Sequence, residues 1–511
     1  MRFGRRTTVA AAVVAGALAL SACGGGGNAA GGSGSGAGSK TLTLGSYTDA
    51  TPWDPALAHV GHFLPLYQAA YDSLIRRDPD GKLQPMLATD WKWNTGNTVL
   101  TLNLRKGVTF KDGAAFDAAA VKANFDHFKK ANGPQGSTMR NVDSVKVVDT
   151  DTVEYRLSAP DPALPIYLSN AAGLMGSPKA LDTDAIKSEP DGTGPYVMDK
   201  TATVTGSQYT FKKREGYWAP ELQKFDTVTF KYMPDTTARL NALVSGQIDA
   251  ALLDPKSAAQ AKSSNLTETT KQVDWQGLLL LDKAGKQVKA LADPKVRQAM
   301  NYAIDRKGLL DAMLLGRGTV TSQVFGASTA AYNEDLDGYY SYDPAKAKKL
   351  LAEAGYPNGF SISMPVSSSF DPVVFSTITQ QFGEVGITVK QESVQDSDYR
   401  NKVLSGQFPM AFYGIFQPEP WIAINHHVGP NAAFNPGKYT DATAQALIDR
   451  VQKGGTDGDA AAKELDKYVT EQAWFVPFFR VDQVYFNRPT ITVQQQIQQA
   501  VPSIYNYAPA S

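Results

Sequence analysis

The stretch Val99–Leu104, with the sequence Val-Leu-Thr-Leu-Asn-Leu, decides the class of fold to which the chain is assigned. Apolar and polar side chains alternate along it, which is typical of a strand with one buried face. A turn at residues 111–113 follows, and Asp117 is placed to cap a helix that carries Val121 and Phe125 on one face. The chain here therefore passes from a half-buried strand to an amphipathic helix.

The same two patterns recur on both sides of this stretch. Residues 41–46 alternate as a strand, and residues 145–148 and 153–157 form two alternating runs separated by a short polar turn, which predicts a hairpin. Further along, an Asp-Pro pair begins a helix at three places, with the aspartate as N-cap: Asp293, Asp343 and Asp371. A strand at Ile387 and Val389 follows the third helix, so the alternation indicates an α/β fold.

The N-terminus has the pattern of an export signal. Three arginines (Arg2, Arg5, Arg6) precede an apolar run at residues 9–20, which is too short to span a bilayer but long enough for the core of a signal peptide. The sequence Leu-Ser-Ala-Cys at 20–23 resembles the lipobox of bacterial lipoproteins. The resemblance implies cleavage after residue 22, giving a signal peptide 1–22, and lipidation of Cys23. The arginine pair at 5–6 leaves both the general and the twin-arginine export routes open.

Residues 23–39 contain little but Gly, Ser and Ala, a composition that favours a flexible tether. The chain has 50 Lys and Arg residues and 50 Asp and Glu residues. Loss of the signal peptide removes three of the positive charges, which leaves a net charge of about −3. No Lys/Arg-rich run follows, so we expect no nucleic-acid partner. A body of this length predicts two or more domains, and no second apolar run is long enough to cross a membrane.

Several motifs of the body together resemble the peptide/nickel/opine type of extracellular solute-binding protein, solute-binding protein family 5, the capture subunits of ABC importers. They occur in the order of that family and cover most of the chain after the tether. The motifs are LATDW at 87–91, LRKGVTFKDG at 104–113, GTGPY at 192–196, Tyr217-Trp218, SGQID at 245–249, VRQAMNYAIDR at 296–306, YDP at 342–344 and GY at 355–356.

The resemblance implies the periplasmic-binding-protein type II-like α/β fold, with two lobes, a hinge and an additional inserted domain. On this interpretation lobe 1 combines residues 40–75, 186–270 and 471–511, the inserted domain is 76–185, and lobe 2 is 271–470. Ligand is then enclosed between the lobes, and closure requires that it bind the closed form more tightly. Most of the motif residues, among them Gly107, Gly113, Gly194, Gly246, Arg297 and Asp305, are expected to serve turns and helix contacts rather than ligand.

An enclosed site needs aromatic walls and a few polar groups, so aromatic side chains outside helical faces are the candidates for ligand contact. Core packing is an equally good interpretation for each one taken singly. Trp421 is the first choice because prolines at 418 and 420 make its segment loop-like. The candidate ligand-binding residues are Tyr47, Trp53, Trp275, Gln276, Phe325, Phe416, Glu419 and Trp421.

The segment 413–421 departs from the peptide-binding relatives. Those relatives place an acidic residue there to receive the α-ammonium of the peptide, whereas this chain has Gln417 and Pro418 before Glu419. A buried ammonium without a carboxylate is costly. Either Glu419 receives it or the ligand is not a free peptide.

The adjacent His426 and His427 raise the possibility of a nickel chelate, but they have no acidic or cysteine neighbours, and no metal site or cofactor is predicted. No nucleophile elbow, phosphate loop or zinc helix is present, so an enzyme, such as an unrecognised hydrolase, is the weaker hypothesis. A chaperone or sensor of the same fold is a third. We predict a monomeric lipoprotein that binds a short peptide, or else a sugar, modified amino acid or chelate, and delivers it to the permease subunits of an ABC transporter.

Overall fold

The computed structural model describes residues 40–50 and 52–510. The predicted signal peptide, Cys23 and the tether lie outside the described residues. The chain divides into two units, and everything below concerns the second, Ser39–Ser511. Among its described helices, none combines the length and the apolar character that crossing a bilayer requires.

A nine-stranded sheet contains the first strand of the chain near its middle, in the order β16-β12-β17-β11-β1-β10-β9-β8, with β13 paired to β17. β1 pairs in parallel with β10 and β11, and the other pairs are antiparallel. The strands are β1 Thr41–Ser46, β8 Tyr196–Met198, β9 Gln208–Lys213, β10 Thr227–Tyr232, β11 Ala250–Leu253, β12 Thr267–Leu280, β13 Gly318–Val320, β16 Met410–Phe416 and β17 Phe475–Asn487.

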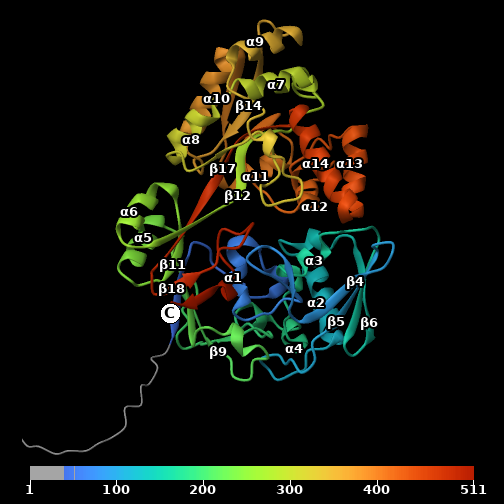
Figure 1. Ribbon diagram of the computed structural model, residues 1–511, viewed down its shortest axis with the longest axis vertical. Helices are drawn as coiled ribbons and strands as arrows, with labels where there is room; N and C mark the ends of the chain where they lie inside the picture. Colours follow the sequence, from blue (N-terminus) through green and yellow to red (C-terminus); the bar gives the residue numbers. More distant parts are fainter. Residues whose placement is uncertain (1–39, 51, 511) are drawn as a thin grey trace, which may run out of the picture. The chain divides into compact units, whose positions relative to one another are not determined.

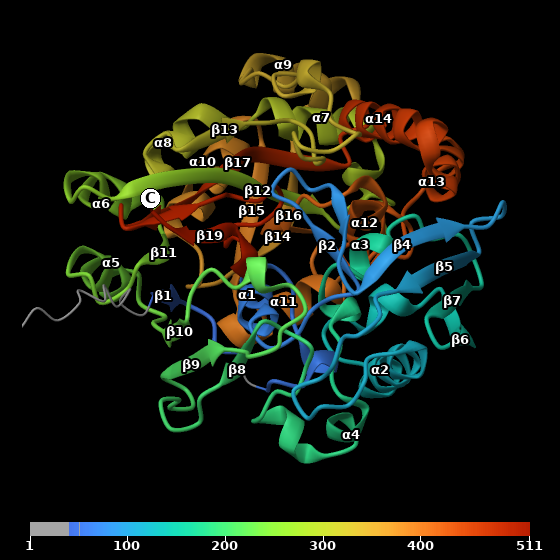
Figure 2. The same cartoon turned by 60° about the horizontal axis from the view of Figure 1, so that its bottom comes forward.

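The predicted strand, hairpin and helix around Val99–Leu104 are confirmed. They form a four-stranded sheet of β4 (Ala88–Trp93), β5 (Val99–Leu104), β7 (Thr152–Leu157) and β6 (Val142–Asp149), and Figure 2 shows α2 (Ala118–Ala131) beside it. The Asp117 carboxylate accepts a hydrogen bond from the backbone N–H of Ala120 at 2.9 Å, which caps the helix. Paired short strands complete the sheets: β2 Ile75–Arg77 with β3 Leu83–Pro85, β14 Phe360–Val366 with β15 Ile387–Ser393, and β18 Ile491–Val493 with β19 Tyr507–Pro509.

The three predicted Asp-Pro helix starts are also confirmed. Asp293, Asp343 and Asp371 each accept a backbone N–H in the first turn of α7 (Pro294–Tyr302), α9 (Pro344–Glu353) and α10 (Pro372–Glu384). The remaining α-helices are α1 Leu64–Gln68, α3 Leu164–Tyr167, α4 Pro178–Leu181, α5 Thr236–Val244, α6 Ala258–Ser263, α8 Arg306–Leu314, α11 Asp396–Leu404, α12 Pro420–Ala423, α13 Ala442–Lys453 and α14 Gly455–Glu471.

Two long strands, β12 and β17, join two parts of the large sheet (Figure 1). We call lobe 1 the part around β1 and β8–β11, and lobe 2 the part that holds β13–β16 and α7–α14. The first half of β12 pairs with the end of β17 beside β11, and its second half pairs with the start of β17 beside β16. The register shifts between Gln272 and Trp275, so the ladder is irregular where the lobes meet. The boundary that the sequence suggests at residues 270 and 271 falls inside β12.

Two features differ from the sequence interpretation. Trp275 and Gln276 lie in β12, and Trp421 lies in the short helix α12 rather than in a loop, because Pro420 begins a helical turn there. Gly194 serves no left-handed turn: a Cβ on it would lie 2.3 Å from the backbone carbon of Ala70, so this glycine allows close approach of two chain segments. Gly107, Gly113 and Gly246 do have positive φ, as turn glycines should.

Candidate functional site

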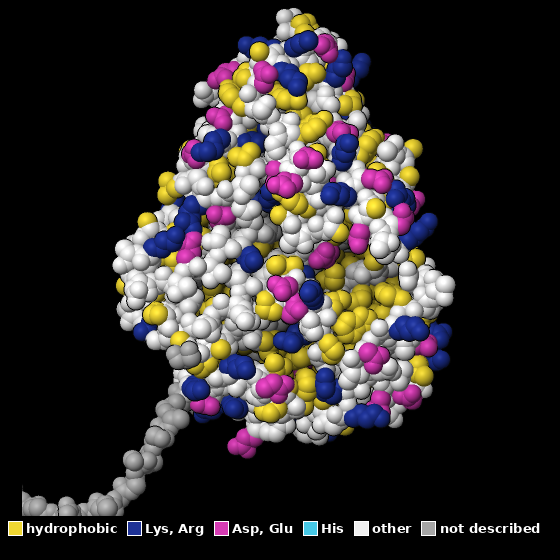
Figure 3. All heavy atoms as spheres, viewed as in Figure 1, with side chains coloured by type: hydrophobic (Ala, Val, Ile, Leu, Met, Phe, Trp, Pro, Cys, Tyr) yellow, Lys and Arg dark blue, Asp and Glu magenta, His cyan; other side chains and the backbone are white. Residues whose placement is uncertain are grey.

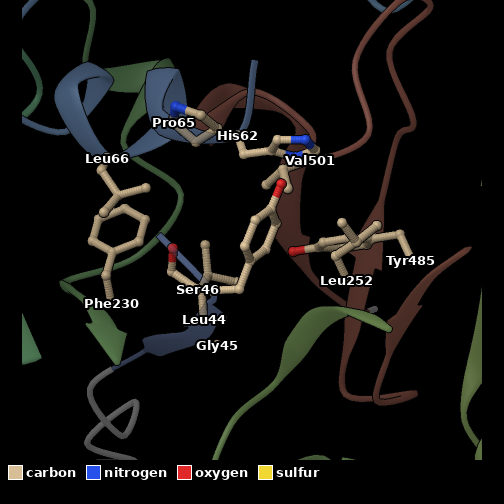
Figure 4. A pocket seen from close by; sticks show the side chains of 11 residues that line it. Leu44, Gly45, Ser46, His62, Pro65, Leu66, Phe230, Leu252, Tyr485 and Val501 are labelled. Atoms are coloured by element: carbon tan, nitrogen blue, oxygen red, sulfur yellow. The ribbon is translucent and has the colours of Figure 1, made fainter. Parts of the chain in front are cut away.

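The end of β1 leads directly into a group of polar and aromatic side chains. Tyr47 follows the strand, its ring lies 4.8 Å from that of His62, and the guanidinium of Arg239 lies 5.5 Å from the Tyr47 ring. Burial lowers the pKa of His62 to about 4, so its imidazole is neutral at pH 7. Figure 4 shows His62 and Val501 on the other side of a small cavity from Leu44 and Ser46. This cavity of about 10 Å³ holds about one water molecule.

Asp274 lies at the irregular point of β12, where the two lobes join. It pairs in the sheet with Phe416, the last residue of β16, whose side chain is 40% exposed. Burial raises the pKa of Asp274 to about 6, and the amide of Gln483, 3.4 Å from each carboxylate oxygen, opposes the shift. Burial raises the pKa of Tyr47, the nearby Arg239 lowers it, and the charge of Asp274 raises it further.

The positive charge of Arg400, in α11, acts on side chains of both lobes. Burial lowers the pKa of His59 in lobe 1, and Arg400 lowers it further. Arg400 also lies beside Tyr413 of β16, and burial together with this positive charge lowers the pKa of His426 to about 4. Arg400 and His59 are both exposed.

Glu419 precedes α12 and forms a polar contact with distant parts of the chain. Its Oε1 accepts hydrogen bonds from Gln498 at 3.1 Å and from Arg77 at 3.4 Å, and Arg77 also donates to Gln498 at 2.9 Å. The Arg77 side chain is 7% exposed and that of Glu419 27%. This carboxylate already has a cationic partner.

Two further hydrogen bonds join lobe 2 to the inserted residues 76–185. The amide of Asn97 donates to the carbonyl of Lys453, and that of Gln452 to the carbonyl of Pro160. Trp421 lies beside Asp161, whose pKa burial raises to about 6. Leu164 and Leu168 belong to the same apolar cluster as Trp421, so apolar packing accompanies the polar contacts.

The structure separates the predicted site residues into two groups. Trp53, Trp275 and Phe325 are at most 1% exposed; Trp53 packs against Tyr67, Tyr209 and Phe211. Trp421 is also buried, at 8% exposed, and Gln276 lies within β12. The remaining three lie just after β1, at the end of β16 and just before α12: Tyr47, Phe416 and Glu419. Ligand contact by any of the eight stays a prediction.

Sequence reasoning missed Asp274, Arg400, Arg77 and Gln498. Asp274 had a local signal, since it is a carboxylate between Val273 and Trp275 within an otherwise strand-like run. The contact between Arg77 and Glu419 could not be predicted from the local sequence, because 342 positions separate the two residues.

The histidine pair does not form a metal cluster. The rings of His426 and His427 are 5.7 Å apart at an interplanar angle of 85°, and His427 is fully buried beside Lys283. Among residues 40–50 and 52–510, no group of three or more His, Cys, Asp or Glu could hold a metal ion. On the face in Figure 3, Lys/Arg and Asp/Glu side chains are interspersed rather than gathered into a field of one sign.

Two lobes joined by two long strands are the architecture of proteins that close around a small solute. The profile of the bacterial extracellular solute-binding proteins, family 5 Middle, matches residues 82–425. The glutathione-binding protein GsiB of Salmonella paratyphi A is 33% identical over 366 residues, which cover 69% of each chain. The GsiB of Escherichia coli O157:H7 is 31% identical over 385 residues, 72% of each chain.

Solved structures share the fold. HbpA2 from Haemophilus parasuis matches with a TM-score of 0.80 at 20% identity, over 92% of this chain and 100% of that one. DppA from Helicobacter pylori in complex with the peptide STSA matches with a TM-score of 0.75 at 22% identity, over 92% of this chain and 98% of that one. NikZ from Campylobacter jejuni in complex with Ni(L-His) matches with a TM-score of 0.73 at 21% identity, over 92% of this chain and 99% of that one. The chain belongs to the bacterial extracellular solute-binding proteins of family 5, which bind small ligands and work with ABC importers.

Proposed function

We propose that this protein captures a short peptide outside the cell and delivers it to the permease of an ABC importer, as a monomeric lipoprotein held to the membrane by Cys23. The observation that carries the proposal is the joining of two lobes by β12 and β17, on a chain that belongs to family 5. Relatives named for glutathione and a solved relative in complex with the peptide STSA support a peptide-like solute. The protein performs no catalytic step in this proposal.

A non-peptide solute is the second candidate. The substitution of Gln417 for the expected acidic residue favours it, since the Gln417 side chain is 2% exposed and donates its amide N–H to the carbonyl of Val324 rather than facing a ligand. A sugar, a modified amino acid and a nickel chelate are the classes to compare. Two solved relatives are complexes with agropinic acid and with Ni(L-His).

The first experiment is a thermal-shift screen of the chain from Gly24 onward against di- to hexapeptides, sugars, amino-acid derivatives and nickel–histidine. A solute at 100 times its dissociation constant is expected to stabilise the protein by about 2.7 kcal/mol, because it binds only the folded state. A peptide response supports the peptide proposal, and a response to another class alone replaces it with that class. No response from any class would contradict the capture function.

Glu419 of lobe 2 forms a latch with Arg77, in the segment 76–185, and with Gln498 in our proposal, in which the ion pair favours the closed form. Arg77→Met and Glu419→Gln are each expected to weaken binding of every responding solute by about threefold to tenfold, because a smaller closed population lowers the apparent affinity. The double variant is expected to be no weaker than either single one. Isothermal titration measures the affinities, and small-angle scattering of the unliganded proteins measures the shift toward open forms.

The alternative role of Glu419, as the acceptor of a ligand ammonium, gives a different result. In that case Glu419→Gln alone would lose affinity, and only for solutes with a free amine. Arg450→Gln serves as the control, because Arg450 pairs with Asp457 and Glu464 within lobe 2 and no interlobe contact involves it.

A further inference from the structure

Asp274 is a carboxylate whose position in the hinge is not required by the fold. Its neighbours in β12, Val273 and Trp275, are buried in apolar clusters, whereas Asp274 itself is partly exposed. It lies at the register shift between the two lobes, where β12 leaves its pairing with one half of β17 for the other. Asp274 is thus a partly exposed carboxylate at the junction of the two lobes.

No cation accompanies this carboxylate. Among the described residues, no Lys, Arg or His nitrogen lies within 4.0 Å of its oxygens, since none of the ion pairs involves Asp274. Its hydrogen-bonding neighbour, the Gln483 amide, is 3.4 Å from both oxygens, which is long for a hydrogen bond. A partly buried carboxylate without a positive partner is costly, and burial accordingly raises its pKa.

An aromatic residue lies directly across the ladder from the carboxylate. Phe416 is the partner of Asp274 in the antiparallel ladder, where side chains of opposed residues are adjacent, and the charge of Asp274 also raises the pKa of Tyr47. An ammonium group seated on Asp274 would gain attraction from the ring faces as well as from the carboxylate. An anion or a neutral sugar would gain neither.

Other polar side chains near this point are engaged elsewhere. The backbone N–H of Gln417, just after β16, donates to the carbonyl of Val273 at 2.8 Å, and the Gln417 side-chain amide donates to the carbonyl of Val324 at 3.0 Å. Glu419, the other carboxylate near this point, already has Arg77 as its partner.

We propose that Asp274 binds a primary ammonium group of the captured solute, with Tyr47 and Phe416 beside it. The inference rests on the proposed capture function and narrows it to solutes that carry an amine. The amino terminus of a peptide and the amine of a small diamine share this chemistry, and the experiment distinguishes them.

The experiment measures binding of tri-alanine to hexa-alanine, the same peptides with an acetylated amino terminus, and 1,4-diaminobutane, by isothermal titration to the chain from Gly24 onward. The wild type is expected to bind at least one free-amine probe and to bind its acetylated form at least about 30-fold more weakly, as when one partner of a buried charge pair is lost. Asp274→Asn is expected to lose that preference and to bind both forms as the wild type binds the acetylated one. Diamine binding without peptide binding would assign the site to small amines.

Asp482→Asn is the matched control. Asp482 lies on β17 at the same junction, is partly exposed, and has an amide partner in Gln272 at 2.9 Å. The control is expected to keep the full preference for the free amine. A second readout separates binding from a structural role: unliganded Asp274→Asn is expected to melt at or above the wild-type temperature, because an uncompensated charge is removed.

Each other outcome overturns the proposal. Equal binding of free and acetylated peptides, or a response to sugars alone, would leave the capture function intact and remove the ammonium site. If Asp274→Asn still prefers the free amine, the amine binds elsewhere in the protein. If that preference is lost in Glu419→Gln instead, Glu419 is the residue that binds the amine. Absence of binding by every probe and by every class in the wider screen would remove both proposals. A drop in the melting temperature of Asp274→Asn would indicate a structural carboxylate.

Discussion

Replacement of Arg297 by methionine is expected to destabilise lobe 2 by about 3 kcal/mol or more. The side chain is 0% exposed, and its guanidinium donates to four backbone carbonyls, those of Leu291, Ala292, Gln472 and Ala473, at 2.7–3.2 Å. Methionine fills much of the volume but leaves these buried acceptors without donors. Two of them immediately precede β17, so the arginine fixes the start of a strand that crosses between the lobes.

Calorimetry of the variant measures this loss as a fall in the unfolding temperature. The unfolding temperature of Arg297→Lys is expected to lie between those of the methionine variant and the wild type, because an ammonium group can reach fewer of the carbonyls than the planar guanidinium does. Arg450→Met is the control, since that arginine forms its ion pairs on the surface, and it is expected to melt as the wild type does. A methionine variant at 297 that melts with the wild type would contradict the assigned role.

Replacement of Gly194 by alanine is expected to lower the free energy of unfolding by about 2 kcal/mol or more. The new Cβ would lie 2.3 Å from the backbone carbon of Ala70 and 2.4 Å from the backbone nitrogen of Tyr71. Neither atom belongs to a flexible side chain, and the N–H of Gly194 donates to the carbonyl of Ala70 at 2.9 Å, which holds the two segments together. Relief of the clash therefore requires that this hydrogen bond lengthen.

Gly383→Ala is the matched control for this prediction. Gly383 lies in α10, and a Cβ on it would meet nothing within 4 Å. Alanine there is expected to stabilise the helix by about 0.5–1 kcal/mol, because glycine is the poorer helix former. Equal melting temperatures for the two alanine variants would show that the close approach at Gly194 carries no strain.

Features that depend on nearby residues could be predicted from the sequence. The caps at Asp117, Asp293, Asp343 and Asp371 each bond to a backbone N–H two or three residues ahead, so residue type and spacing suffice to predict them. The hairpin at residues 142–157 depends likewise on alternation and a short turn. The family motifs then predicted the two-lobed α/β fold that the solved relatives share.

The candidate site could be predicted only in part, because its contacts join distant segments. The environment of Trp275 depends on strands β16 and β17, more than a hundred residues further along the chain, and they bury it completely. The partner of Glu419 comes from β2, and no local pattern distinguishes Arg77 from any other arginine. Tyr47 and Phe416 were chosen as aromatic side chains outside helical faces, and the structure places them just after β1 and at the end of β16; their contact with ligand stays a prediction.

The central position of β1 in the large sheet has a consequence for how the chain acquires its structure. Thr41 pairs with Thr227, and the other neighbour of β1 is β11, which needs β17 near the end of the chain to complete its own ladder. Contacts between residues so far apart in sequence slow folding, because the entropy of closing long loops is lost before the pairing is gained. Strand β1 therefore finds its two parallel neighbours only after residues 227–253 have been synthesised, and the sheet of lobe 1 is complete only when β17, near the end of the chain, is available.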